Sequence, residues 1–180
     1  MKRSLTFVLF LWCCIALSAQ LTRTVYGISL GEKESNVVQR MVDKKLTIET
    51  EDSQHGKLIS GKGDVIFAGE AWDGVSVSIR NGKVYGILFL KEKEYEEGRE
   101  LIQTFSSLVL SLAEKYPDYA QEPKSKKYSY GIDASVLFKD DKTTIVVTEK
   151  LRPESTSSIT LGYVDNFEFD ALGNEAAKEL

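Results

Sequence analysis

The sequence predicts an α+β protein in which two amphipathic helices pack on one face of an antiparallel sheet. Short runs of alternating apolar and polar residues, joined by glycine turns or short loops, predict antiparallel strands. Two longer segments carry apolar residues at helical spacing, and such stripes must be buried against a sheet. The predicted order is helix, four strands, helix, three strands. Residues 20–180 are expected to form a single domain, either undivided or built as two tandem halves over 20–90 and 91–165 with a tail at 166–180.

The first half of the chain is predicted to contain one helix and four strands. Residues 32–44 form the helix, because their apolar side chains repeat at helical spacing. Strands are predicted over 46–50, 64–71, 75–80 and 83–90, with a polar loop or irregular hairpin at 51–63. The dipeptides Asp73-Gly74 and Asn81-Gly82 favour the positive φ angles of tight turns, so the last three strands should form a meander.

The second half begins with a long helix over 92–116, which Pro117 helps to end. Glutamates crowd its first turns, where the helix dipole favours negative charge, so they need no metal ion to explain them. Alternating residues then predict strands over 128–138, 143–149 and 159–163. The tail ends in a helix-prone stretch at 174–180.

The first 19 residues have the pattern of a secretory signal peptide. Lys2 and Arg3 precede a continuous apolar or small run over residues 5–17, and small residues follow it. That run is shorter than the roughly 20 residues of a membrane-spanning helix. We expect cleavage before Gln20 or one residue earlier, with a periplasmic or secreted product. A lipid anchor on Cys13 or Cys14 is disfavoured, because no small residue precedes the pair.

The composition after the signal excludes several classes of protein. Both cysteines lie within the signal, so the remaining chain is cysteine-free and must be stabilised by a packed core, which suits a bacterial envelope. It retains 21 of the 23 basic residues and all 27 acidic ones, which gives a net charge of −6. This balance disfavours nucleic acid as a partner, because nucleic-acid binders usually present a basic face.

The sequence contains no complete catalytic or cofactor-binding motif, because each near match lacks a residue that its chemistry requires. Residues 56–63 nearly match a phosphate-binding loop, but Gly63 occupies the position of the magnesium-binding Ser or Thr, and a strand follows instead of a helix. His55 is the only histidine, and no nucleophile elbow accompanies it. One imidazole and no cysteine make a poor zinc site. We therefore predict no catalytic residue, no cofactor and no metal.

One hairpin suggests a binding surface. In a regular ladder closed by Asn81-Gly82, the Val75, Val77 and Ile79 side chains share one face with their partners on the next strand. The other face then carries Tyr85, Ile87 and Phe89 beside small polar residues, and Trp72 at the neighbouring turn extends this row. The row is either buried under a loop or the second half of the protein, or it is an exposed platform for a protein or glycan.

Some segments resemble known exported proteins. Residues 67–69, 72–75 and 81–84, with the helix end at 112–117, are similar to small exported proteins of Bacteroidetes that have no assigned activity. The entry at 27–31 resembles domains of the β-lactamase-inhibitor-protein type or of the outer-membrane assembly lipoprotein type. This resemblance implies a layered domain that binds other proteins through a sheet face. The chain departs from the assembly lipoproteins because no convincing lipid-attachment cysteine follows the signal.

These observations favour an exported, non-enzymatic protein that binds an envelope or extracellular protein through a sheet face. The residues predicted to form the binding surface are Trp72, Tyr85, Ile87 and Phe89. Two alternatives stay open: a glycan-binding module that uses aromatic stacking, and a hydrolase of envelope polymers that uses two carboxylates converging in a cleft. No membrane span is expected after signal cleavage.

Overall fold

A computed structural model describes residues 20–53, 56–94, 98–121, 123–128, 131–152 and 155–176. The predicted signal peptide at 1–19 and the sole histidine, His55, lie outside these residues. None of the helices within the described ranges is long and apolar enough to cross a membrane.

Within these ranges the structure contains a pair of two-residue strands, eight longer strands, three α-helices and one short 3-10 helix. In chain order they are β1 Thr24–Val25, β2 Ile28–Ser29, α2 Glu34–Asp43, β3 Thr47–Ser53, β4 Gly56–Phe67, β5 Glu70–Arg80, β6 Lys83–Lys93, α3 Gly98–Lys115, η2 Pro117–Tyr119, β7 Lys124–Tyr128, β8 Gly131–Lys139, β9 Thr143–Leu151, β10 Ser157–Asp165 and α4 Asn166–Ala176. The mixed α+β class predicted from the sequence is confirmed.

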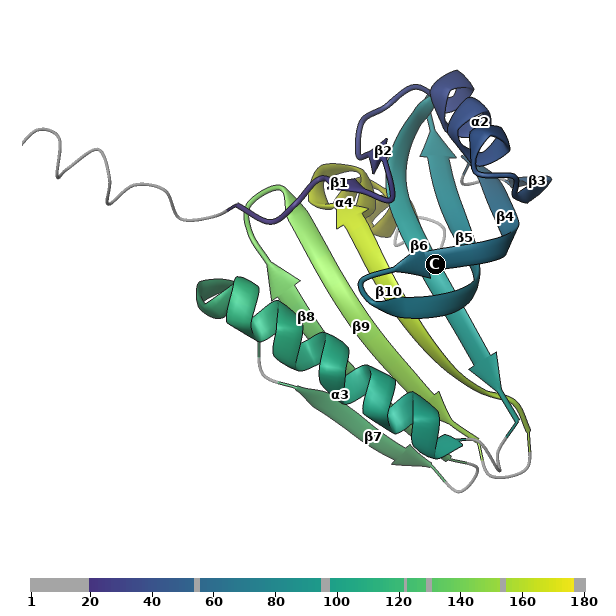
Figure 1. Ribbon diagram of the computed structural model, residues 1–180. Coiled ribbons are helices and arrows are strands. Elements are labelled where there is room, and N and C mark those ends of the chain that lie inside the picture. The colour runs from purple at the N-terminus through teal and green to yellow at the C-terminus, as the bar shows by residue number, and fades with distance from the viewer. Residues whose placement is uncertain are drawn as a thin grey trace, which may run out of the picture.

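Eight strands form one antiparallel sheet in the order β3-β4-β5-β6-β10-β9-β8-β7. Each half of the chain supplies a helix followed by four consecutive strands, and the last strands of the two halves, β6 and β10, pair at the centre of the sheet (Figure 1). β1 and β2 form a separate pair. The sheet therefore joins the two halves into one continuous layer.

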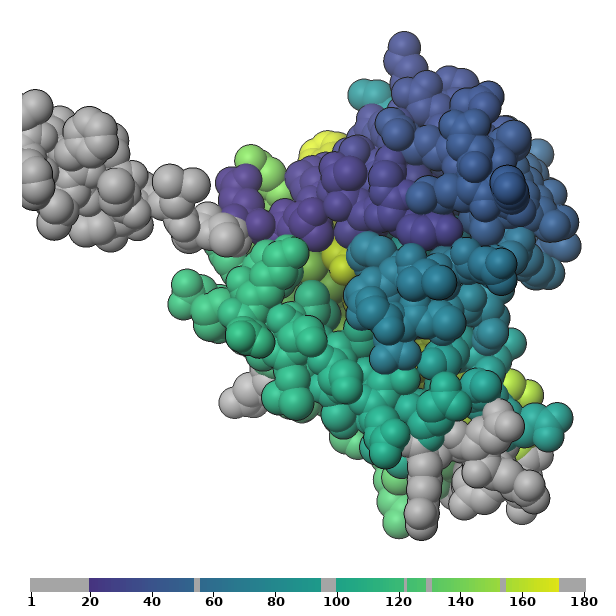
Figure 2. Space-filling view, in the orientation of Figure 1, coloured from purple at the N-terminus to yellow at the C-terminus, as the bar shows by residue number. Residues whose placement is uncertain are grey.

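One face of this sheet, the covered face, is packed under α2, α3 and the N-terminal segment. A Cβ on Gly61 would lie 3.4 Å from the Met41 sulfur of α2. On the same face, the Lys91 ammonium lies 3.0 Å from the Glu100 carboxylate of α3. In the space-filling view α3 and the β4–β5 turn close over most of this side (Figure 2). The largest fully buried side chains of the eight-stranded sheet and the helices are Val37, Met41, Ile59, Val65, Ile87, Phe89, Leu101, Phe138, Ile145, Ile159 and Leu161.

The predicted order is wrong in the second half, which has four strands instead of three. The single strand expected over 128–138 is divided into β7 and β8. Gly131 opens β8 with a φ of +152°, and a Cβ there would lie 2.0 Å from the Leu151 carbonyl oxygen. The bend at this glycine lets Lys124–Tyr128 pair back on β8 as an edge strand. The C-terminal helix also begins earlier than expected, at Asn166.

The prediction of a turn at Asp73-Gly74 is also wrong. β5 runs without interruption through these residues, and the chain reverses at Ala68 and Gly69, which have φ angles of +55° and +80°. The Asp73 carboxylate instead accepts a hydrogen bond from the Glu92 backbone N–H at 2.6 Å. The turn predicted at Asn81-Gly82 is confirmed, since Arg80 pairs with Lys83 and both turn residues have positive φ.

Candidate functional site

The register of the central hairpin places the predicted binding residues differently from our expectation. Ile79 pairs with Val84 as predicted, but Ser78 then pairs with Gly86 and Val77 with Ile87. Tyr85 is the extra residue of a β-bulge, which shifts the pairing by one position. Because side chains alternate between faces, that shift moves every later residue of β6 to the opposite face.

Three of the four predicted binding residues lie in the core. The shift buries Ile87 and Phe89, and Trp72 is buried within β5 and does not lie at a turn. Trp72, Ile87 and Phe89 are 3%, 1% and 0% exposed, and only Tyr85 is half-buried. The Phe89 ring stacks on Phe67 with a centroid separation of 4.5 Å. The Trp72 indole N–H donates to the Phe67 carbonyl at 3.0 Å. Of the two alternatives for this row, burial is the one found for Trp72, Ile87 and Phe89, and the exposed aromatic platform is wrong. Trp72 and Phe89 cannot stack on a sugar from this position.

The bulge instead creates a different surface, which we call the open face. It is the face of the sheet opposite α2 and α3, and its centre consists of Ser76, Ser78, Gly86, Leu88, Leu90, Ser135, Leu137, Thr144, Val146, Thr148, Ser158, Thr160, Gly162 and Val164. Most of these residues are half-buried, and Leu88 is 39% exposed, whereas their neighbours along each strand are buried in the core.

Apolar side chains form a row across the middle of the open face. Leu88, Gly162 and Val146 are neighbours on β6, β10 and β9, and Val146 pairs in turn with Leu137. A Cβ on Gly162 would lie 3.0 Å from Val146 and 3.4 Å from Leu88, so these two side chains meet above the glycine. The flanking residues on one side are Leu90, Thr160, Thr148 and Ser135, and those on the other side are Gly86, Val164, Thr144 and Lys139.

Charged side chains on the open face are confined to its margins. Arg80 and Glu92 lie at opposite ends of the hairpin strands, and Lys150 and Lys139 lie on β9 and β8. The helix α4 begins at one end, where Glu168 lies 3.8 Å from Arg80. An uncharged centre with a charged rim is the usual anatomy of a protein-binding surface.

A carboxylate with an altered pKa is found on the covered face. Glu149 is 6% exposed, and its Oε1 has no hydrogen-bond partner among the residues that the structure describes. Burial raises the pKa of this carboxyl group. The Glu70 and Glu100 carboxylates are instead paired with Lys91, and the hydrogen bond to Lys91 holds the pKa of Glu100 down. Glu149 is thus a buried side chain, and it does not line the cavity described below.

Glu149 should make stability depend on pH. A folded-state pKa above the unfolded value means that stability falls as pH rises through the window between the two pKa values, and that the loss persists at neutral pH. We expect Glu149→Gln to raise the free energy of unfolding by about 1 kcal/mol at pH 7.5, with a smaller gain at pH 4. Urea unfolding at both pH values measures the difference.

The matched control for this prediction is Glu51→Gln on the exposed strand β3, which should change stability little at either pH. An equal effect of Glu149→Gln at both pH values would contradict the assignment of a buried, uncompensated carboxylate.

Among the described residues, no group of three or more His, Cys, Asp or Glu side chains could hold a metal ion. No protein family model, curated protein or solved structure matches this chain. The function proposed below is therefore inferred from the arrangement of the open face.

Proposed function

We propose that this chain is an exported, non-enzymatic protein that binds another protein through the open face of its sheet. The observation that supports this proposal is the contrast between the two faces. One is buried under α2 and α3, and the other presents Leu88, Val146 and Leu137 in one row, with the charged Lys139 beside its β8 end. Burying such a row against a partner removes apolar area from water without desolvating a charge.

The chemistry of the open face indicates what the partner must offer. Serine and threonine hydroxyls beside the apolar row can donate and accept hydrogen bonds, so the partner should present an uncharged surface with aliphatic or aromatic anchors. The predicted export signal favours an encounter in the periplasm or outside the cell. This role is also the one implied by the resemblance to inhibitor-type and assembly-type domains.

Site-specific photo-crosslinking tests the proposal. A photoreactive amino acid at Thr148 on the open face should give a discrete protein adduct in an envelope extract. The same amino acid at Ile102, an exposed position of α3 on the other side of the molecule, should not. Adducts from Ile102 alone, or from neither position, would contradict the proposal.

Charge introduced into the apolar row should abolish binding to the captured partner. Leu88→Asp combined with Val146→Asp is expected to weaken the affinity by roughly 100-fold or more, because two buried anchors become unpaired charges. Val38→Asp with Val42→Asp on α2 is the matched control, since both valines are already exposed. Surface plasmon resonance measures the affinities, and thermal unfolding checks that both variants fold.

A further inference from the structure

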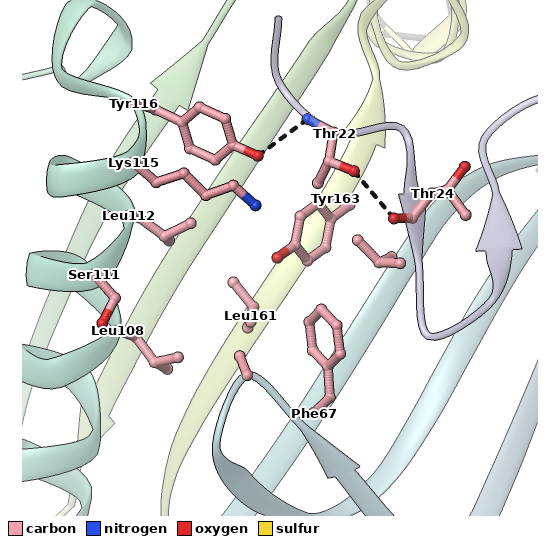
Figure 3. A pocket seen from close by; sticks show the side chains of 12 residues that line it. Thr22, Thr24, Phe67, Leu108, Ser111, Leu112, Lys115, Tyr116, Leu161 and Tyr163 are labelled. Atoms are coloured by element: carbon pink, nitrogen blue, oxygen red, sulfur yellow. Dashed lines mark hydrogen bonds between the residues drawn. The ribbon is translucent and has the colours of Figure 1, made fainter. Parts of the chain in front are cut away.

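A cavity of about 340 Å³ lies on the covered face, where the two halves of the chain meet (Figure 3). Its walls come from the second half of α3, the turn between β4 and β5, and the N-terminal segment, and β10 forms its floor. In Figure 2 residues of β10 are seen in a gap between α3 and that turn. The lining residues are Thr22, Thr24, Val25, Phe67, Ala68, Leu108, Ser111, Leu112, Lys115, Tyr116, Leu161 and Tyr163.

Each wall of this cavity is fixed by contacts of its own. The Phe67 ring is held by its stack on Phe89, and Leu108 is buried on α3. Several contacts hold the N-terminal segment. The Thr22 backbone N–H donates to the Tyr116 hydroxyl at 3.3 Å, and Arg23 forms an ion pair with Asp165. The cavity is therefore a preformed site, as small-molecule sites usually are.

A tyrosine hydroxyl is available inside the cavity. Tyr163 is 4% exposed, and its hydroxyl has no hydrogen-bond partner among the described residues. Figure 3 shows this hydroxyl pointing into the space bounded by Leu112, Leu108 and Phe67. Burial raises the pKa of Tyr163, so the phenol stays neutral and can donate a hydrogen bond. Because this hydroxyl lines the cavity and has no acceptor among the described side chains, it can donate a hydrogen bond to a ligand bound there.

A positively charged side chain lines the same cavity. Lys115 on the last turn of α3 lines the cavity, and its ammonium lies 5.2 Å from the centroid of the Tyr116 ring. Figure 3 shows the Lys115 side chain extending from the helix toward the cavity. No carboxylate belongs to the lining, so the site favours a negative charge on its ligand.

We propose that this cavity binds a small amphipathic monocarboxylate. The hydrocarbon body lies among Leu108, Leu112 and Phe67, the carboxylate accepts a hydrogen bond from the Tyr163 hydroxyl, and the Lys115 ammonium balances its charge. A single lysine matches a single negative charge, whereas phosphate recognition typically uses arginine forks or several donors. At about 30 Å³ for each small group, the cavity holds roughly eleven non-hydrogen atoms, which is close to the size of octanoate.

Calorimetric titration with octanoate tests the proposal, with octan-1-ol and octylamine as matched ligands. Octanoate should bind saturably and more tightly than either analogue. Tyr163→Phe should weaken octanoate binding roughly tenfold or more, because it removes a hydrogen bond to a charged acceptor. Lys115→Met should weaken octanoate binding and leave octan-1-ol binding unchanged, whereas Lys150→Met on the opposite face should change neither.

A steric variant provides a second measurement. Ser111→Phe places a ring in the lining of the cavity and should abolish binding, while Ser107→Phe, one turn earlier and outside the lining, should not. The absence of saturable octanoate binding at millimolar concentrations would overturn the proposal. Equal affinities for octanoate and octan-1-ol, or unchanged affinity in Tyr163→Phe, would also overturn it. Because the open face lies on the other side of the sheet, Leu88→Asp with Val146→Asp should leave octanoate binding intact.

Discussion

Phe89→Ala is expected to lower the free energy of unfolding by about 3–5 kcal/mol, whereas Leu88→Ala at the adjacent position should cost less than about 1 kcal/mol. Phe89 is fully buried, stacks on Phe67, and lies 5.6 Å from the Trp72 ring centroid, so its loss leaves a large cavity. Leu88 lies on the open face and is partly solvated already. Urea unfolding of the two variants measures the difference.

This pair of substitutions also tests the register of the hairpin. In a ladder without the bulge, Leu88 would face the core opposite Val75, and Phe89 would face the other side. In the structure Val75 pairs with Phe89 and Ser76 with Leu88. A larger loss of stability for Leu88→Ala than for Phe89→Ala would contradict the bulge at Tyr85, and with it the composition of the open face.

Gly131→Ala is expected to lower the free energy of unfolding by about 3 kcal/mol. Its φ of +152° disfavours any side chain, and a Cβ would lie 2.0 Å from the Leu151 carbonyl oxygen, so the backbone of β8 or β9 would have to move. Hydrogen exchange should show that β7 and the beginning of β8 lose protection first.

The control is Gly27→Ala, because Gly27 also has a positive φ, of +79°, but a Cβ there meets no atom within 4 Å. Gly27→Ala should lower the free energy of unfolding by only about 1 kcal/mol, because it places a side chain on a left-handed backbone without a steric clash. A similar loss in both variants would indicate that conformation alone, and not the close approach of β9, makes Gly131 necessary.

The two proposed sites occupy opposite faces of one sheet, and this separation makes them independently testable. The open face depends on the apolar row at Leu88 and Val146, while the cavity depends on Tyr163 and Lys115. Tyr163 and Gly162 are consecutive residues of β10, so the same strand contributes to both. Variants on either face can therefore be compared within the same fold.

Local patterns predicted most of the elements because their causes are local. Helical spacing of apolar residues indicated α2 and α3, and the Asn81-Gly82 dipeptide indicated the correct turn, since positive φ is a property of those two residues. The turn at Ala68-Gly69 was missed because alanine rarely adopts positive φ. It is held by the pairing of β4 with β5 and by the hydrogen bond from the Trp72 indole N–H to the Phe67 carbonyl.

The sequence alone determined the class of the fold, the two covering helices and the approximate positions of the strands, because propensity and periodicity act within a few residues. The tertiary structure alone decided the bulge at Tyr85, the pairing of β6 with β10, and therefore which side chains face solvent. The physical reason is that a one-residue shift in pairing hardly changes local propensity but exchanges the two faces of a strand. Packing of Phe89 against Phe67 of β4 and Trp72 of β5 favours one register over the other.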